Sequence, residues 1–178
     1  LTSIDQVSDS PTNNYATMNV LDNYYASSTF SEGNLKIVTN ASNETFNTAT
    51  IPMFSGKWYW EIKVTSGQPR EFIGITDVVT TSSSGAYSDA PKARSYYSFD
   101  GQSVTGSTGN GAYGATYGTG DIMGVALDID NGYLYFSKNG TFQNSGDPTS
   151  GATGTGGLSI NSSPTNGYWL CQVGEIYS

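Results

Sequence analysis

The amino-acid sequence predicts a single all-β domain of the sandwich kind, with little or no helix. Three observations support this prediction: two long strand patterns occupy the middle of the chain, turns rich in Gly, Asn and Ser separate the apolar runs, and no segment carries the apolar period of a long helix. A length of 178 residues suits one such domain. We therefore expect one hydrophobic core.

The chain is expected to divide at residue 32. Residues 1–32 mix turn formers with scattered aromatic residues, so we expect an irregular segment with short strands that packs on the domain. Residues 33–178 are expected to form the sandwich itself. The start of the chain lacks an initiator Met and the basic-then-apolar layout of a signal peptide, which suggests a processed chain or an excised segment.

Residues 33–51 predict the first strands of the sandwich. Leu35 and Ile37 alternate with polar residues, and Phe46 follows a turn rich in Asn and Ser. Alternation on both sides of such a turn is typical of a hairpin. We expect a hairpin there.

The strongest strand pattern is GKWYWEIKV, residues 56–64. Its apolar face collects Trp58, Trp60, Ile62 and Val64. Its other face collects Tyr59, Glu61 and Lys63. One face is therefore expected in the core, and Trp60→Ala is expected to be severely destabilising. The run EFIGIT, residues 71–76, has an inner glycine that suits a buried strand or a bulge, and we expect it to pair with residues 56–64.

The second strong pattern covers residues 121–142, where two apolar runs flank Asp-Asn-Gly. Asn131 and Gly132 favour positive φ at both turn positions, which predicts a two-residue type I′ hairpin. That register forms two apolar pairs, Ile129 with Leu134 and Leu127 with Phe136. All four side chains then share one face and are expected in the core.

The remaining segments predict long loops and one last strand. Residues 79–119 and 149–157 are rich in Gly, Ser and Thr, and Tyr96, Tyr97 and Phe99 indicate a short strand within the first of them. The final GYWLCQVGEIYS predicts a strand that ends with the chain.

Composition excludes several classes of function. With 7 basic and 15 acidic residues the net charge is −8, so nucleic acid and membrane insertion are not expected. Histidine is absent, which removes the commonest general base and zinc ligand. The one cysteine, Cys171, excludes an internal disulfide and a cysteine metal cluster. We expect no metal and no cofactor.

Loop tyrosines are the candidate ligand-binding residues. They lie in or beside segments of Ser and Gly, a composition typical of binding surfaces in which rigid rings make the contacts. The candidates are Tyr87, Tyr96, Tyr97, Tyr113 and Tyr117. The alternative is that Tyr96, Tyr97 and Tyr117 only cover an edge of the sandwich.

Two sets of polar side chains raise catalytic or metal-binding alternatives. Asp128, Asp130 and Asn131 offer oxygen ligands for calcium, but their spacing lacks the later ligands, and turn chemistry explains them better. A glycosidase pair could also be drawn from four acids near strands: Glu61, Glu71, Asp77 and Asp121. Acids facing outward beside strands are ordinary, so we do not expect an enzyme.

The two strand patterns and the EFIGIT run together resemble the SPRY family over residues 33–174. The residues that carry the resemblance are Gly56, Trp60, Glu61, Phe72, Gly74, Ile75, Gly120, Asp121, Gly124, Leu127, Asp128, Gly132, Phe136, Asn139 and Gly140. The resemblance implies a bent sandwich of two antiparallel sheets and a protein-interaction role without catalysis. The family's closing strand, with an Asn-Phe-Gly element, is missing after Ser178, so we expect either a fragment or a fold completed elsewhere.

A looser resemblance links DSPTNNYATMNVLDNYY and TFSEGNLKI to segments that precede SPRY-like domains in structural or tail-fibre proteins of bacteriophages, marine ones especially. It agrees with a surface of Ser, Thr, Asn, Gly and Tyr. The first hypothesis is therefore a virion or extracellular appendage module. It would recognise a host surface glycan or protein, or decorate a capsid by binding other virion proteins, and could form a homo-oligomer such as a trimer. The alternatives are a cellular SPRY adaptor that binds a partner peptide and, less favoured, a carbohydrate-active enzyme.

Overall fold

The computed structural model describes residues 16–22, 24–25, 28–39, 44–67, 70–79, 90–160 and 163–175. Strands account for nearly all the regular structure there, and the helical part of these residues is one 3₁₀ turn, Gly151–Thr153. The predicted all-β class is confirmed. Within the same residues, no helix is long and apolar enough to cross a lipid bilayer.

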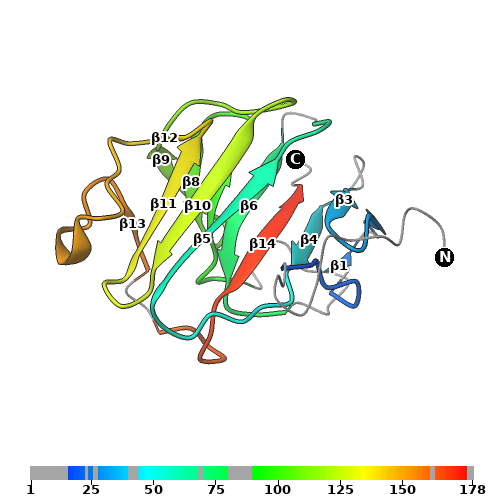
Figure 1. Ribbon diagram of the computed structural model, residues 1–178, viewed down its shortest axis with the longest axis horizontal. Coiled ribbons are helices and arrows are strands. Elements are labelled where there is room, and N and C mark those ends of the chain that lie inside the picture. The colour runs from blue at the N-terminus through cyan, green and yellow to red at the C-terminus, as the bar shows by residue number, and fades with distance from the viewer. Residues whose placement is uncertain are drawn as a thin grey trace.

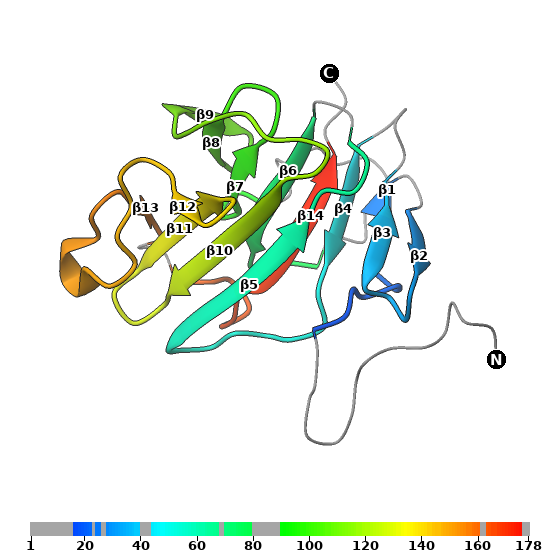
Figure 2. The same cartoon turned by 45° about the horizontal axis from the view of Figure 1, so that its top comes forward.

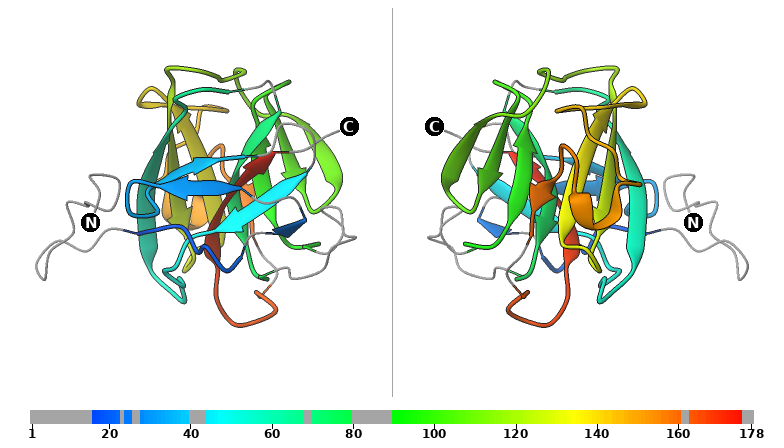
Figure 3. Two further views of the ribbon diagram at one scale, coloured as in Figure 1. Left: turned by 90° about the vertical axis from the view of Figure 1, so that its right-hand side faces the viewer. Right: turned by 90° about the vertical axis from the view of Figure 1, so that its left-hand side faces the viewer.

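Two antiparallel sheets form the layers of a sandwich (Figure 1). The larger sheet has the spatial order β1 (Tyr24–Tyr25), β4 (Thr45–Thr48), β14 (Leu170–Glu175), β6 (Glu71–Thr76), β7 (Arg94–Tyr97), β8 (Gln102–Thr105) and β9 (Thr108–Ala112). The smaller sheet has the order β12 (Thr141–Phe142), β11 (Tyr133–Lys138), β10 (Ile122–Asp128) and β5 (Lys57–Lys63), with β13 (Leu158–Ser159) also paired to β11. A separate hairpin of β2 (Thr29–Ser31) and β3 (Lys36–Val38) lies in front of both layers in the left view of Figure 3.

Strands that follow one another in the first half of the chain do not pair as the sequence predicted. The expected hairpin of β5 with β6 is wrong, because β5 pairs with β10 while β6 pairs with β7 and β14. The hairpin expected within residues 33–51 is also wrong, since β3 pairs with β2 and β4 pairs with β1 and β14. Figure 2 shows β5 crossing in front of the layer that holds β14. Placing β5 and β6 in opposite layers lets their apolar faces cover each other.

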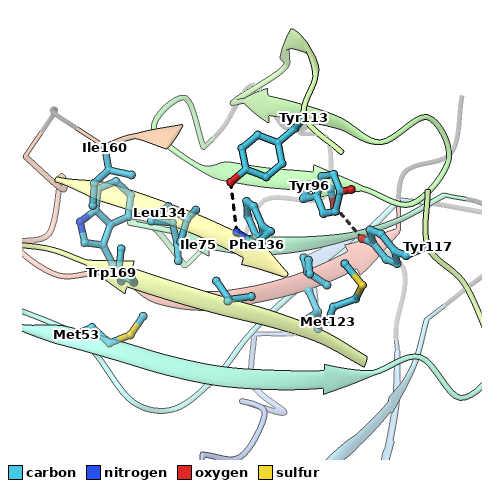
Figure 4. Packing of buried hydrophobic residues seen from close by; sticks show 14 of the residues in the cluster. Met53, Ile75, Tyr96, Tyr113, Tyr117, Met123, Leu134, Phe136, Ile160 and Trp169 are labelled. Atoms are coloured by element: carbon cyan, nitrogen blue, oxygen red, sulfur yellow. Dashed lines mark hydrogen bonds between the residues drawn. The ribbon is translucent and has the colours of Figure 1, made fainter. Parts of the chain in front are cut away.

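The main core fills the space between the two layers (Figure 4). Ile73 and Ile75 reach it from β6, and Met123, Val125 and Leu127 reach it from alternate positions of β10. Each of these side chains is buried. Full burial of one aliphatic side chain contributes about 1.5–3 kcal/mol to folding.

The core residues named from the sequence fall into three groups. Leu127, Leu134 and Phe136 are buried, while Trp60, Ile62 and Ile129 are half-buried and pack against the core. Trp58 is 37% exposed, so its assignment to the core is wrong. The cause is its position at the beginning of β5, the edge strand of the smaller sheet. There its indole N–H donates a hydrogen bond to the carbonyl oxygen of Ser55 at 2.8 Å.

The hairpin of β10 and β11 exists, but its register differs from the prediction by two residues. The observed pairs include Leu127 with Leu134 and Val125 with Phe136. Asp128 causes the shift, because its carboxylate accepts hydrogen bonds from the backbone N–H and the side-chain amide of Asn131, at 3.0 and 2.8 Å. Its carbonyl also accepts from the Gly132 N–H at 2.9 Å, which closes a loop over residues 129–132. A shift of two residues leaves every side chain on its expected face.

The larger sheet is buried on its outer face as well. A second apolar cluster there contains Phe46, Phe72, Ala90 and Ala93. The rings of Phe46 and Phe72 lie 5.4 Å apart. The inner glycine of β6, Gly74, marks close packing within a buried strand, because a Cβ on it would lie 1.9 Å from the Arg94 carbonyl oxygen of β7.

The described part of the N-terminal segment is joined to the larger sheet by strand pairing and by buried polar contacts. β1 pairs with β4, and the boundary after residue 32 falls inside the β2–β3 hairpin. Asp22 is buried and accepts a hydrogen bond from the Thr48 hydroxyl, while its carbonyl accepts from the Asn47 side-chain amide at 3.1 Å. Burial raises the pKa of Asp22 to about 6, and the bonds from Thr48 oppose that rise.

The predicted last strand is present as β14. It lies in the middle of the larger sheet, with β4 on one side and β6 on the other (Figure 1). Val173 contributes to the main core from its inner face. The need for a further closing strand beyond Ser178 stays a prediction.

Candidate binding surfaces

Three of the tyrosines predicted to bind a ligand lie inside the fold. Tyr96, Tyr113 and Tyr117 are 0%, 4% and 5% exposed, so the prediction that they present their rings to a ligand is wrong. We call these three residues the tyrosine cluster. The Tyr96 ring stacks on Phe136 at 5.3 Å and lies 5.5 and 5.4 Å from the rings of the other two (Figure 4).

The hydroxyl groups of the tyrosine cluster hold loop backbone against the core. Tyr113 donates to the Gly156 carbonyl oxygen at 3.0 Å, and Tyr117 donates to the Tyr96 carbonyl oxygen at 2.8 Å. Tyr96 donates to the Ala115 carbonyl oxygen. Burial raises the pKa of Tyr113 to about 12 and raises that of Tyr96 as well. These rings therefore fasten the loops instead of presenting them.

Of the other two candidate tyrosines, the structure describes Tyr97. Tyr97 is half-buried and packs against the outer cluster of the larger sheet, with its ring 6.4 Å from that of Phe72. Tyr87 lies outside the described residues.

The candidate catalytic carboxylates each have separate partners. Glu61 accepts a hydrogen bond from the Tyr59 hydroxyl at 2.8 Å, and Glu71 accepts from Ser98 at 3.0 Å. Asp121 forms an ion pair with Lys138 at 3.1 Å. Hydrogen bonds from the Gly118 N–H and the Asn139 amide hold the Asp121 pKa below its ordinary value.

The residues of the predicted calcium alternative are also engaged by protein partners. The carboxylate of Asp128 accepts a hydrogen bond from Asn131 and forms an ion pair with Lys57 at 2.9 Å. Burial of Asp128 works to raise its pKa, but the bonds from Lys57 and Asn131 outweigh burial and lower it. Among the described residues, no group of three or more acidic, His or Cys side chains could hold a metal ion.

An aromatic pair of an exposed Phe54 and a half-buried Tyr168 lies at one end of the sandwich. Met53 and Trp169 join the β4–β5 connection to the start of β14 by two backbone hydrogen bonds of 2.8 and 2.9 Å, and both side chains are buried. Neighbours in an extended chain point to opposite sides, so Phe54 and Tyr168 face outward. Their rings lie 5.8 Å apart in an edge-to-face arrangement, and Phe54 is 63% exposed. We call them the Phe54–Tyr168 pair.

The base beneath the Phe54–Tyr168 pair is firmly held. Asp77 is fully buried, and one carboxylate oxygen accepts hydrogen bonds of 2.6 Å from both the N–H and the hydroxyl of Thr165. The Asn166 amide donates to the Asp77 carbonyl oxygen at 3.0 Å. These bonds attach the turn before Tyr168 to the end of β6. The turn and the β4–β5 connection lie together at the lower end in Figures 1 and 2.

A second surface lies on the outer face of the smaller sheet. A groove of about 260 Å³ is lined by Lys57, Trp58, Tyr59, Ala126, Leu127, Asp128, Tyr135, Phe142 and Pro148. We call it the sheet groove. Tyr59 is 56% exposed, and the apolar lining is framed at one end by the ion pair of Lys57 with Asp128.

Sequence reasoning missed both surfaces. Phe54 and Tyr168 each stand beside another large apolar residue, Met53 and Trp169. Such doublets indicate that one member must face outward in an extended chain, but they do not say which one. The backbone hydrogen bonds between Met53 and Trp169 decide which member of each doublet faces outward.

Comparison with known proteins agrees with this architecture. The SPRY domain family model matches residues 57–168. The SPRY domain of human HERC1 superposes with a TM-score of 0.58 at 13% identity, covering 78% of this chain and 79% of that one. A second human SPRY domain gives a TM-score of 0.56 at 18% identity, covering 78% of this chain and 81% of that one.

A curated relative in Drosophila melanogaster also matches. It is named Ran-binding proteins 9/10 homolog, and it is 30% identical over 95 residues, which make up 51% of this chain. The match spans 10% of the length of that relative. The family model covers more than half of this chain, and the solved SPRY domains share its fold. The chain belongs to the SPRY domain family.

Proposed function

We propose that this SPRY domain is a non-catalytic binding module that captures a protein partner on the Phe54–Tyr168 pair. SPRY domains are protein-interaction modules. The observation that carries the proposal is an exposed Phe54 ring on a base tied by two backbone hydrogen bonds to buried residues. Exposed apolar side chains on a rigid base are suited to recognition.

The energy available from this pair supports a specific contact. Covering an aromatic ring contributes about 1.5–3 kcal/mol by area, and a few such anchors dominate a typical interface. The bonds of Asp77 to Thr165 position the turn before Tyr168 in advance, so little ordering cost accompanies binding. Ile51 and Trp58, both 37% exposed, add apolar area at neighbouring positions of the chain.

Two features support the absence of catalysis. The sequence holds no histidine, and each of the candidate carboxylates Glu61, Glu71 and Asp121 has its own hydrogen-bond or ion-pair partner. Catalytic acids and bases are instead expected to converge on one site.

A peptide-display selection tests the proposed surface. Peptides selected on the wild-type domain are labelled, and their dissociation constants are measured by fluorescence anisotropy on variants. Phe54→Ser and Tyr168→Ser are each expected to weaken binding by about tenfold or more, since each removes an anchor. The matched control is Val38→Ser, which removes another exposed apolar side chain, 55% exposed on β3. Equal affinity of all three variants and the wild type would contradict the proposal.

We further propose a virion or extracellular setting, in which the partner is a host surface protein or glycan or another virion protein. Support comes from composition: only 12% of residues are charged, and the sequence holds 22 Gly and 13 Tyr. A glycan array with wild type and Phe54→Ser tests the glycan version, and flat binding across sugars would remove it. Light scattering of the purified domain tests the proposed trimer.

The cellular adaptor is the second candidate function, and one observation favours it. The curated relative that matches 51% of this chain is a Drosophila melanogaster protein. An adaptor is expected to bind selected peptides and no glycan. A full-length reading frame with neighbouring interaction domains would favour this candidate, and neighbouring capsid or fibre regions would favour the virion setting.

A further inference from the structure

The sheet groove lies over Ala126, a small residue of β10, beside the exposed ring of Tyr59 and the buried ring of Tyr135. Gly124 and Ala126 occupy outward positions of β10, and Tyr59 of β5 and Tyr135 of β11 stand on either side of Ala126 in the strand register. Tyr59 reaches across the floor, because a Cβ on Gly124 would lie 2.6 Å from its hydroxyl oxygen. A bulkier residue in place of Ala126 would fill the groove.

Backbone pairing excludes one way of binding. β10 is hydrogen-bonded to β5 on one side and to β11 on the other, so its backbone has no free edge along the floor. A ligand therefore cannot add to β10 as a strand. It must be recognised by what its side chains place in the groove.

Charge around the groove is one-sided. Lys57 is balanced by its ion pair with Asp128 at 2.9 Å. Three further acids stand close by: Glu61 accepts from the Tyr59 hydroxyl, Asp130 contributes to raising the Lys57 pKa, and Asp147 precedes the lining Pro148. Lys63 shares the outer face of β5, but four residues beyond Tyr59 place it about 13 Å further along the strand. The whole chain carries −8.

We propose that the sheet groove binds a basic, extended segment of a protein partner. A Lys or Arg of that segment lays its alkyl stem along the exposed ring of Tyr59, opposite Phe142 and Pro148, and its cationic head faces Glu61 or Asp147. Long basic side chains cover apolar surface in this way, and an exposed tyrosine ring attracts a cation. A volume of about 260 Å³ suits one such side chain and is small for a cofactor.

The test uses two labelled peptides, one alternating Gly and Arg and one alternating Gly and Glu, with fluorescence anisotropy as the measurement. The Arg peptide is expected to bind at least about tenfold more tightly than the Glu peptide, and binding should weaken as salt screens the charges. Ala126→Leu fills the floor and is expected to weaken Arg-peptide binding by about tenfold or more. Glu61→Gln is expected to weaken it by about threefold.

Two controls separate this surface from general charge attraction and from the Phe54–Tyr168 pair. Glu32→Gln makes the same charge change on the β2–β3 turn and should leave the affinity unchanged. Phe54→Ser should also leave it unchanged, so failure here and failure of the proposed function are distinguishable. If Ala126→Leu does not fold, Tyr59→Ala replaces it, because it removes the opposite wall. Unchanged Arg-peptide affinity in the folded groove variant overturns the proposal.

Discussion

The tyrosine cluster and the Phe54–Tyr168 pair place similar rings in opposite environments. Tyr113, Tyr117, Phe54 and Tyr168 lie in segments between strands, and Tyr96 lies on β7. The rings of Tyr96, Tyr113 and Tyr117 are almost fully buried, whereas Phe54 is 63% exposed. The hydroxyl groups of the tyrosine cluster donate hydrogen bonds to backbone carbonyl oxygens. The Phe54–Tyr168 pair is positioned by the backbone hydrogen bonds between its buried neighbours, Met53 and Trp169.

The difference shows that loop composition does not decide which rings face a partner. Tyr113 and Tyr117 lie among glycines, a setting typical of binding loops, and yet they point inward. Phe54 precedes Ser55 and Gly56, and Tyr168 follows Gly167, so the outward-facing rings stand in a similar setting. The buried and the exposed rings differ in where their backbone is hydrogen-bonded to the sandwich. In an extended segment, a residue held with its side chain inward leaves its neighbour pointing outward.

Tyr96→Ala is expected to have the largest effect. Removing this fully buried ring leaves a cavity beside Phe136 and should lower the free energy of unfolding by about 3–5 kcal/mol. Urea unfolding followed by tryptophan fluorescence measures it. The matched control is Tyr59→Ala, which removes an exposed ring and should cost less than about 1 kcal/mol. Similar losses for both variants would break the comparison.

The second largest expected effect is a loss of stability at alkaline pH, caused by the tyrosine cluster. The pKa of Tyr113 is about 12 in the folded protein and 10.0 for an unburied tyrosine, so the unfolded chain loses its proton first as pH rises. Stability should therefore be intact below pH 10 and fall between pH 10 and 12, by on the order of 2 kcal/mol from this group. Unfolding free energies measured across this range test the slope. Tyr113→Phe should reduce the slope, while Tyr96, whose pKa burial also raises, keeps part of it. An unchanged slope would contradict burial of Tyr113 as a cause.

Tyr117→Phe is expected to have a moderate effect. The ring stays in place, but the Tyr96 carbonyl oxygen loses a donor at 2.8 Å in a buried site. A lost hydrogen bond of this kind costs about 1–2 kcal/mol. The same urea unfolding measures it, and a neutral result would show that the hydroxyl does not fasten the loop.

Phe54→Ser is expected to have the smallest effect on stability. The ring is mostly in water, so the free energy of unfolding should change by less than about 0.5 kcal/mol. Partner binding should fall while stability holds, which is the reverse of Tyr96→Ala. A loss above about 1.5 kcal/mol would place Phe54 in the core and remove the contrast.

Strand positions could be predicted from the sequence, and strand partners only in part. The patterns at residues 56–64, 71–76 and 121–142 all form strands, and the faces of β10 and β11 are as expected. The partner of β5 was missed because the paired residues lie about 60 to 70 positions apart in the chain, and the alternation of one strand does not name the strand beside it. The binding surfaces were missed for a related reason, since the Phe54–Tyr168 pair exists only after two distant segments meet.

The sequence by itself determined the all-β class, the SPRY resemblance and the apolar faces of the main strands, because these depend on local period and turn chemistry. The tertiary structure alone decided the two-residue shift at Asp128, the exposure of Trp58 and the burial of the tyrosine cluster. Each of these depends on a contact between chain segments, or on a side chain that competes with the backbone for hydrogen bonds. Local patterns predict which residues are candidates for burial. Tertiary packing decides which of these residues are buried.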